Sequence, residues 1–181
     1  MKTLFPVLLG TVVLASVLMP TITSARMNET EIQMQSRYGA PDNAPVPPML
    51  QLLEGAITRV YNFKGWKIRA AFLKERVVRI SYSKQPPYIS SPAIQDDEAK
   101  AVLDAEVGNG KWEEIARLQP KPLKSLPWAS SDKAWVHSNG NVACLHLSKM
   151  ILQIDSPAVD EYLAERAAET ETKRKASIPK F

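Results

Sequence analysis

Cysteine is nearly absent from this sequence, because Cys144 is the single one in 181 residues. One cysteine cannot form an internal disulfide, so the chain is not one of the small scaffolds that disulfides hold together. No cysteine follows the apolar run near the N-terminus, so nothing there resembles a lipoprotein processing site. The folded protein must therefore be stabilised by the packing of its core.

Common motifs for catalysis and metal binding are also missing. The chain contains no G-x-S-x-G motif, no phosphate-binding glycine loop, no H-E-x-x-H and no C-x-x-C. The acidic clusters at residues 96–98 and 113–114 fit the first turn of a helix and a solvated edge better than a catalytic carboxylate pair. We therefore expect no catalytic residue, no bound metal and no cofactor.

Only one segment of the chain is long and apolar, the run LFPVLLGTVVLASVLM at residues 4–19. It contains Pro6 and Gly10 and is shorter than the ~20 residues that span a bilayer. Lys2 precedes it, and small residues at Thr23 and Ala25 follow it, which is typical of a secretory signal peptide. We predict a signal peptide over residues 1–25, with cleavage after Ala25, and a periplasmic or secreted protein without a transmembrane span. The alternative is an uncleaved N-terminal segment that holds the protein in the membrane.

A strong excess of one charge is absent as well. The formal charge is +4, and removal of residues 1–25 takes away one lysine and leaves +3 on 156 residues. Such a small excess does not favour nucleic acid as a partner. This length is sufficient for one ordinary core or two small ones.

The most strongly patterned segment is YNFKGWKIRAAFLKERVVRISYSK at residues 61–84, which predicts three antiparallel strands. A two-residue turn at Lys64-Gly65 would pair Phe63 with Trp66 and would place both side chains on one face. For the second turn, a two-residue loop at residues 74–75 would mix apolar with polar residues across the strands. A three-residue loop at residues 74–76 keeps them apart, and we predict this longer loop.

This register gives the predicted meander one apolar face and one polar face. The apolar face would consist of Tyr61, Phe63, Trp66, Ile68, Ala70, Phe72, Val78, Ile80 and Tyr82. The polar face would consist of Asn62, Lys67, Arg69, Arg79, Ser81 and Ser83. Lys67, Arg69 and Arg79 gather there with no acidic side chain assigned to the same face. They are either an ordinary solvated face or a docking surface for an anionic partner, such as a lipid headgroup, an envelope polymer or an acidic protein patch.

Each half of the chain is predicted to contain a helix followed by strands. A helix is predicted from Asn28, as its cap, to Arg37, and another from Gln95 to Val107. Strands are predicted at residues 112–115, on both sides of Asn139-Gly140 and at residues 150–154, and a last helix begins at Ser156-Pro157. The fold class is α+β, with antiparallel three-stranded meanders packed against helices, and two similar helix-plus-sheet units are one interpretation. The units cover residues 26–89 and 90–172, and residues 173–181 are interpreted as a basic, disordered tail.

A two-residue turn at Asn139-Gly140 would place Trp135, His137, Cys144 and His146 together on one partly covered face. We interpret Trp135, His137 and His146 as a candidate surface for a partner. The two histidines would lie roughly 13 Å apart at ~3.3 Å per residue, which is too far for a shared metal ion. Cys144 and His146 would be neighbours, so a thiol nucleophile paired with a histidine stays open as an alternative.

The motifs RYGAP at residues 37–41 and VYNFKGWKIRAAFLKERVVRISY at residues 60–82 resemble a known family of small exported domains. These are the outer-membrane assembly lipoproteins of the SmpA/OmlA type and the related β-lactamase-inhibitor-like folds. The resemblance covers residues 28–84 and, less clearly, residues 93–155. It implies a helix followed by a three-stranded antiparallel sheet that serves as a binding scaffold.

Together these patterns predict a non-catalytic exported binding protein or envelope scaffold, with an envelope protein or an anionic surface as its partner. The alternative is a small exported thiol hydrolase that uses Cys144 with a nearby histidine.

Overall fold

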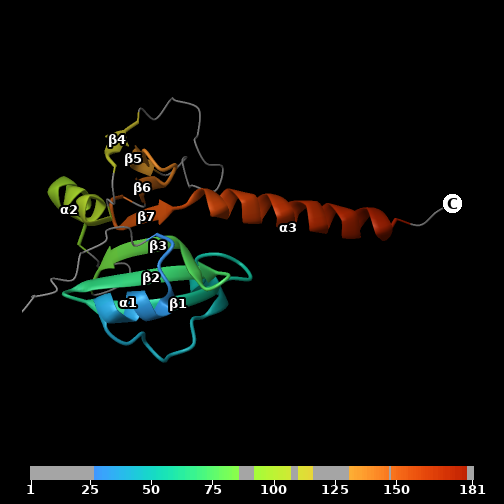
Figure 1. The fold of residues 1–181 in the computed structure, drawn as a ribbon, viewed down its shortest axis with the longest axis horizontal. Helices are drawn as coiled ribbons and strands as arrows, with labels where there is room; N and C mark the ends of the chain where they lie inside the picture. Colours follow the sequence, from blue (N-terminus) through green and yellow to red (C-terminus); the bar gives the residue numbers. More distant parts are fainter. Residues whose placement is uncertain (1–26, 86–91, 107–109, 116–130, 147, 179–181) are drawn as a thin grey trace, which may run out of the picture.

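The computed structural model describes residues 27–85, 92–106, 110–115, 131–146 and 148–178 (Figure 1). Three α-helices, one short 3-10 helix and seven strands lie in this part of the chain. The elements are α1 (Glu31–Tyr38), η1 (Pro48–Leu50), β1 (Ile57–Phe63), β2 (Trp66–Leu73), β3 (Arg76–Lys84), α2 (Asp96–Glu106), β4 (Trp112–Glu114), β5 (Ser131–His137), β6 (Val142–His146), β7 (Ile151–Asp155) and α3 (Pro157–Ala176). The predicted α+β class, with antiparallel meanders packed against helices, is confirmed.

All seven strands form one sheet in the order β1-β2-β3-β7-β6-β5-β4, and every neighbouring pair is antiparallel. Two meanders, β1–β3 and β4–β7, are joined edge to edge through β3 and β7. At this junction Arg79 is opposite Asp155 and Tyr82 is opposite Leu152. The two halves therefore share one continuous sheet.

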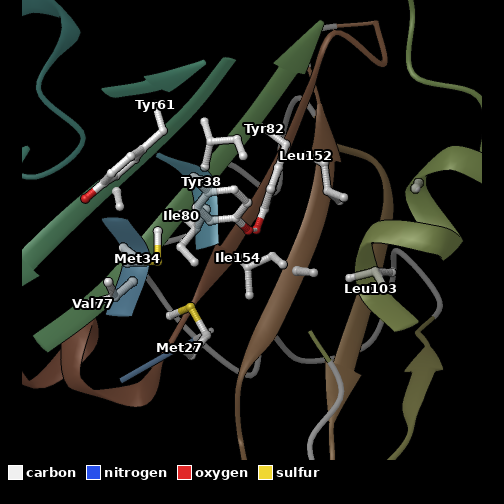
Figure 2. Close-up of a cluster of buried hydrophobic side chains, with 14 of the residues drawn as sticks. Met27, Met34, Tyr38, Tyr61, Val77, Ile80, Tyr82, Leu103, Leu152 and Ile154 are labelled. Carbon is white, nitrogen blue, oxygen red and sulfur yellow. Dashed lines mark hydrogen bonds between the residues drawn. The ribbon is translucent and has the colours of Figure 1, made fainter. Parts of the chain in front are cut away.

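Helices α1 and α2 cover the same face of the sheet, which we call the helical face. Met34 and Tyr38 of α1 and Leu103 of α2 belong to one buried cluster with residues of both meanders. Figure 2 shows this cluster, with Tyr82, Leu152 and other strand residues between the two helices. Burial of these apolar side chains on both sides of the β3–β7 junction stabilises the joined sheet.

The start of α1 differs from the prediction. Thr30, not Asn28, is the N-cap, and its side chain and that of Gln33 form a reciprocal capping box. Asn28 instead has a positive φ of 71°, and its N–H donates to Val77 O of β3 at 2.8 Å. The chain before α1 is thus tied to the sheet. The helix ends at Tyr38, one residue after the predicted Arg37, and Gly39 is its C-cap.

The opposite side of the sheet, which we call the second face, is covered at β2 and β3 by α3 and by residues before β1. Val159 in the first turn of α3 packs with Leu53, Ala71 and Val78. The rest of α3 projects away from the sheet (Figure 1). It continues to Ala176, so the segment predicted to be a disordered tail from residue 173 begins as helix.

The first hairpin has the predicted register, with Phe63 opposite Trp66 and Tyr61 opposite Ile68. The prediction for the second turn was wrong. Lys74 and Glu75 form a two-residue turn, with φ values of 48° and 63°.

A β-bulge on β3 explains why the strands beyond this turn still pair as predicted. Phe72 is opposite Val77 and Ala71 is opposite Arg79, so Val78 is the extra residue. The bulge returns Ile80 to its place opposite Ala70. It also moves Val78 to the second face, and Val77 takes its predicted place on the helical face.

The register of the second hairpin is also different from the prediction. The N–H of His137 donates to Asn141 O at 2.8 Å, so the loop has three residues, 138–140, and not two. Gly140 takes the left-handed conformation that such a loop needs, with φ of 89°. Trp135 is therefore opposite Ala143 and not Cys144.

The predicted signal peptide, residues 1–25, lies outside the described residues. Within the described part of the chain, no helix is both long and apolar enough to span a bilayer.

Candidate functional site

An apolar cleft of about 540 Å³ opens on the helical face between α1, the tip of the β1–β2 hairpin and α2. Its lining residues come from five elements and from one turn. They are Tyr38, Phe63, Lys64, Trp66, Ile68, Tyr82, Glu98, Ala101, Val102 and Ala105. Because α1 and β1–β3 belong to the first half and α2 to the second, the cleft depends on how the two halves meet.

The wall formed by the hairpin follows directly from its two-residue turn. Lys64 and Gly65 both have positive φ, 48° and 82°, which is the requirement of a tight hairpin turn. This turn places Phe63 and Trp66 opposite each other on the helical face. Phe63 also meets the ring of Tyr38 edge-on, with 5.4 Å between the ring centroids. The aromatic contact fixes this wall against α1.

The wall formed by α2 is low because its residues there are small. Ala99 and Leu103 are buried against the sheet, whereas Ala101 and Ala105 are exposed and line the cleft. Ala101 and Ala105 are one helical turn apart and thus lie on the same side of α2. Larger side chains at these positions would fill the space.

The floor of the cleft contains a chain of buried hydroxyl groups. The Tyr82 hydroxyl donates to Oε1 of Glu106 at 2.5 Å and lies 3.1 Å from the Tyr38 hydroxyl. Because Tyr82 uses its proton for Glu106, Tyr38 donates to Tyr82. Figure 2 shows the two tyrosine rings with their hydroxyl oxygens close together. This network fixes both rings, so the floor is largely preformed.

The rim of the cleft carries charges of both signs. Glu98 lies 2.6 Å from the ammonium group of Lys84, and this pair lowers the pKa of the Glu98 carboxyl below its ordinary value. The Lys64 ammonium lies 5.2 Å from the centroid of the Phe63 ring. The rim thus combines one neutralised acid with an exposed lysine.

The predicted cationic surface of Lys67, Arg69 and Arg79 differs from the observed one at Arg79. Arg79 is buried, and its guanidinium group binds the carboxylate of Asp155 through two hydrogen bonds, at 2.8 Å and 2.7 Å. It also donates to Leu52 O at 2.7 Å. The prediction that no acidic side chain shares this face is wrong, because Asp155 reaches it from β7, a strand predicted to belong to the second meander.

Lys67 and Arg69 lie on the second face, as the predicted register requires, but they are only half-exposed. The Arg69 side chain donates to Ser81 Oγ across the strands at 3.4 Å. Because Asp155 neutralises Arg79, the second face does not carry the cluster of three positive charges on which the docking hypothesis depended.

The second predicted group, Trp135, His137 and His146, is divided between the two faces. The three-residue loop turns Trp135 and His137 toward the helical face, where the His137 ring lies 5.0 Å from the ring of Trp112. His146 lies on the second face with Cys144. These residues therefore do not form one surface.

Both histidines are buried. Nδ1 of the buried His137 accepts the Asn139 N–H at 3.2 Å, which helps to hold the loop. Burial lowers the pKa of His146 below its ordinary 6.5, and the positive charges of Arg69 and Arg79 lower it further, against the opposite effect of Asp132. A lowered pKa keeps this imidazole neutral at neutral pH. Its contribution to stability is present above the unfolded value and declines as the pH falls below it.

Cys144 is completely buried on the second face. Burial raises the pKa of its thiol to about 12, and a hydrogen bond with Ser131 opposes this increase only in part. A thiolate is the reactive form of cysteine, so this thiol is a poor nucleophile at neutral pH. Among the residues that the structure describes, no group of three or more potential ligands could hold a metal ion.

We expect iodoacetamide at about pH 8 to leave Cys144 unmodified in the folded protein, because the thiol is both inaccessible and protonated. The same reagent should modify it fully in concentrated guanidinium chloride. Intact-mass analysis measures both results. Rapid modification of the folded protein would contradict this description of Cys144.

Comparisons with known proteins do not assign the chain to a family. No family model and no curated protein match it. Among solved structures, it is similar to a cysteine-rich secretory protein from Staphylococcus aureus, with 10% sequence identity and a TM-score of 0.39. That alignment covers 75% of this chain and 49% of the other, so this chain spans about half the length of the solved one.

The cleft was missed in the sequence analysis although most of its lining was correctly placed on one face. Phe63, Trp66, Ile68 and Tyr82 were all assigned to the apolar face, and they were interpreted as core. The signal that could have indicated a cleft is the pair of alanines at positions 101 and 105 on an otherwise amphipathic helix.

Proposed function

We propose that this protein is a non-catalytic binding protein, exported to the periplasm or secreted, and that its cleft receives the apolar part of a ligand. The observation that carries this proposal is the cleft itself, about 540 Å³ in volume and lined by four aromatic side chains. Small-molecule sites are typically apolar cavities of ~300 to 1,000 Å³ with a few polar groups. The fixed tyrosines of the floor reduce the ordering that binding would need.

A non-catalytic role is supported by the chemistry of the lining. The lining residues that the structure describes include no histidine, cysteine or serine. The alternative thiol hydrolase would depend on Cys144, which is buried on the other face of the sheet and has a raised pKa. A buried, protonated thiol does not favour nucleophilic catalysis.

Two features of the sequence support the remaining parts of the proposal. The short apolar run and the small residues before Arg26 favour export. The order of one helix followed by a three-stranded antiparallel meander, over residues 31–84, is in keeping with the resemblance to SmpA/OmlA-type domains. We extend this resemblance to the role of a binding scaffold in the cell envelope.

The test is the binding of an uncharged fluorescent probe, N-phenyl-1-naphthylamine, to the purified protein. We expect saturable binding that Ala105→Phe weakens by about tenfold or more, because the new ring occupies the cleft. Ala105 is exposed, so this change should leave the fold intact.

Ala168→Phe is the matched control, because Ala168 is an exposed alanine on α3, outside the cleft. It should bind the probe as the parent protein does. Equal affinities for the Ala105 variant and the parent would contradict the proposal, as would a lack of saturable binding by the parent.

A further inference from the structure

We propose that the ligand of the cleft is a small amphiphile, a hydrocarbon chain that ends in a carboxylate, and that the Lys64 ammonium binds this carboxylate at the mouth. This inference rests on the proposed function, and it adds the chemical class of the ligand. It is supported by the charges of the rim and by the position of β2 and β3 in the interior of the sheet.

The rim has one net positive charge. Glu98 is neutralised by Lys84 at 2.6 Å. Lys64 is exposed in its turn, and its ammonium group lies over the ring of Phe63, 5.2 Å from the ring centroid. Among the described residues, no carboxylate lies within ion-pair distance of Lys64. An anionic group at this end of the cleft would therefore gain a partner without breaking an existing pair.

The strands under the cleft favour a hydrocarbon chain over a peptide as the ligand. Ile68 and Tyr82 of the floor lie on β2 and β3, which are interior strands with hydrogen-bonded neighbours on both sides. A peptide that binds by strand addition needs an open sheet edge, and these two strands do not provide one. The edge strand β1 contributes to the described lining only through Phe63, its last residue. Peptide N–H and C=O groups in the cleft would lose hydrogen bonds to water, whereas a hydrocarbon chain has none to lose.

The single lysine favours a univalent anion. A phosphate group carries more charge and is typically bound by arginine forks or by several donors. In the described part of the rim, the Lys84 ammonium group is already paired with Glu98, and the Lys64 ammonium group is a point charge that suits one carboxylate. Because Lys64 lies in the turn of the β1–β2 hairpin, the carboxylate of the amphiphile is expected at the hairpin.

The test compares three ligands with the same chain length in titration calorimetry on the full protein, below their micelle concentrations and at about pH 8, where a carboxylate is ionised. They are dodecanoate, 1-dodecanol and dodecyltrimethylammonium. We expect dodecanoate to bind about fivefold more tightly than dodecanol, which is the upper range for one ion pair at a surface. The cationic ligand should bind more weakly than dodecanol, and the preference for dodecanoate should decrease as salt is added.

Two matched variants assign the preference to Lys64. Lys64→Gln should lower the affinity for dodecanoate to about the affinity for dodecanol. Lys74→Gln is the control, because Lys74 is also exposed and holds the same first position of a two-residue turn, with the same φ of 48°. It should keep the preference of the parent protein.

Failure of this inference can be distinguished from failure of the proposed function. If dodecanol binds in the cleft but dodecanoate has no advantage, or if Lys64→Gln keeps the advantage, the carboxylate assignment is overturned and the binding role stands. If none of the three ligands binds in a manner sensitive to Ala105→Phe, both the class of ligand and the binding role are overturned.

Discussion

Replacing Asp155 with alanine is expected to lower the free energy of unfolding by about 3 to 5 kcal/mol, because it leaves the Arg79 charge buried without its partner. Asp155 is completely buried and Arg79 is 8% exposed. Their two parallel hydrogen bonds, at 2.8 Å and 2.7 Å, join β3 to β7 on the second face of the sheet. The loss should therefore weaken the junction between the two halves, and urea titration followed by circular dichroism measures it.

A double variant separates the value of the pair from the cost of breaking it. Arg79→Met with Asp155→Leu removes both charges and should recover much of the stability that Asp155→Ala loses, because two apolar side chains of similar size leave no unpaired charge. Asp96→Ala is the surface control. Asp96 pairs with Lys133 and Lys149 but is exposed, so we expect little change. Similar losses for the Asp155 and Asp96 variants would contradict the assignment of a buried pair.

The second large effect is expected at Ile68, which is 2% exposed on the helical face. Ile68→Asp places a carboxylate in the apolar layer between the sheet and the helices, and should cost ~3 kcal/mol or more. Lys67→Asp on the neighbouring position faces the other side of β2 and should change the free energy of unfolding by less than about 1 kcal/mol.

Urea titration of both variants under the same conditions measures this difference. Since Ile68 also lines the floor of the cleft, its variant should lose probe binding together with stability. Equal losses of stability for the Ile68 and Lys67 variants would contradict the register of β2 and the separation of its two faces.

The sequence predicted the first hairpin well because all of its determinants are local. The Lys64-Gly65 turn and the alternation on both sides of it admit one register that keeps apolar residues together. The helix in the second half was predictable for the same reason, since Ala99, Leu103 and Glu106 follow the spacing of one helical face.

The two later turns show where such reasoning fails. At residues 74–75 the pattern correctly required Ala70 opposite Ile80, but a bulge at Val78 achieves this with a shorter loop. At Asn139-Gly140 the dipeptide fits either a two-residue loop or the last two positions of a three-residue loop. A change of loop length by one residue moves the side chains of β5 to the opposite face relative to those of β6. The prediction therefore placed Trp135 on the same face as Cys144, whereas the two residues lie on opposite faces.

The buried ion pair and the cleft could not be read from local patterns. Arg79 and Asp155 are 76 positions apart, and their contact requires that β3 and β7 pair. The cleft requires a particular position of α2 relative to the β1–β2 hairpin, which depends on packing across the whole helical face. Periodicity identifies the buried side of each element but not the space left between elements.

Arg79 also bears on the order of folding. The contacts of β1–β3 are local, whereas β7 is separated from β3 by most of the second half, so the β3–β7 pairing is expected to form late. Until then the segment VVRIS of β3, residues 77–81, presents an apolar strand with an open edge, which is a hazard for aggregation. A charged residue in the middle of such a strand acts as a gatekeeper against pairing with other copies. In the native sheet, the strand that pairs with β3 brings Asp155 to that charge. The residue that deters intermolecular pairing in the nascent chain thus also favours the correct strand in the native one.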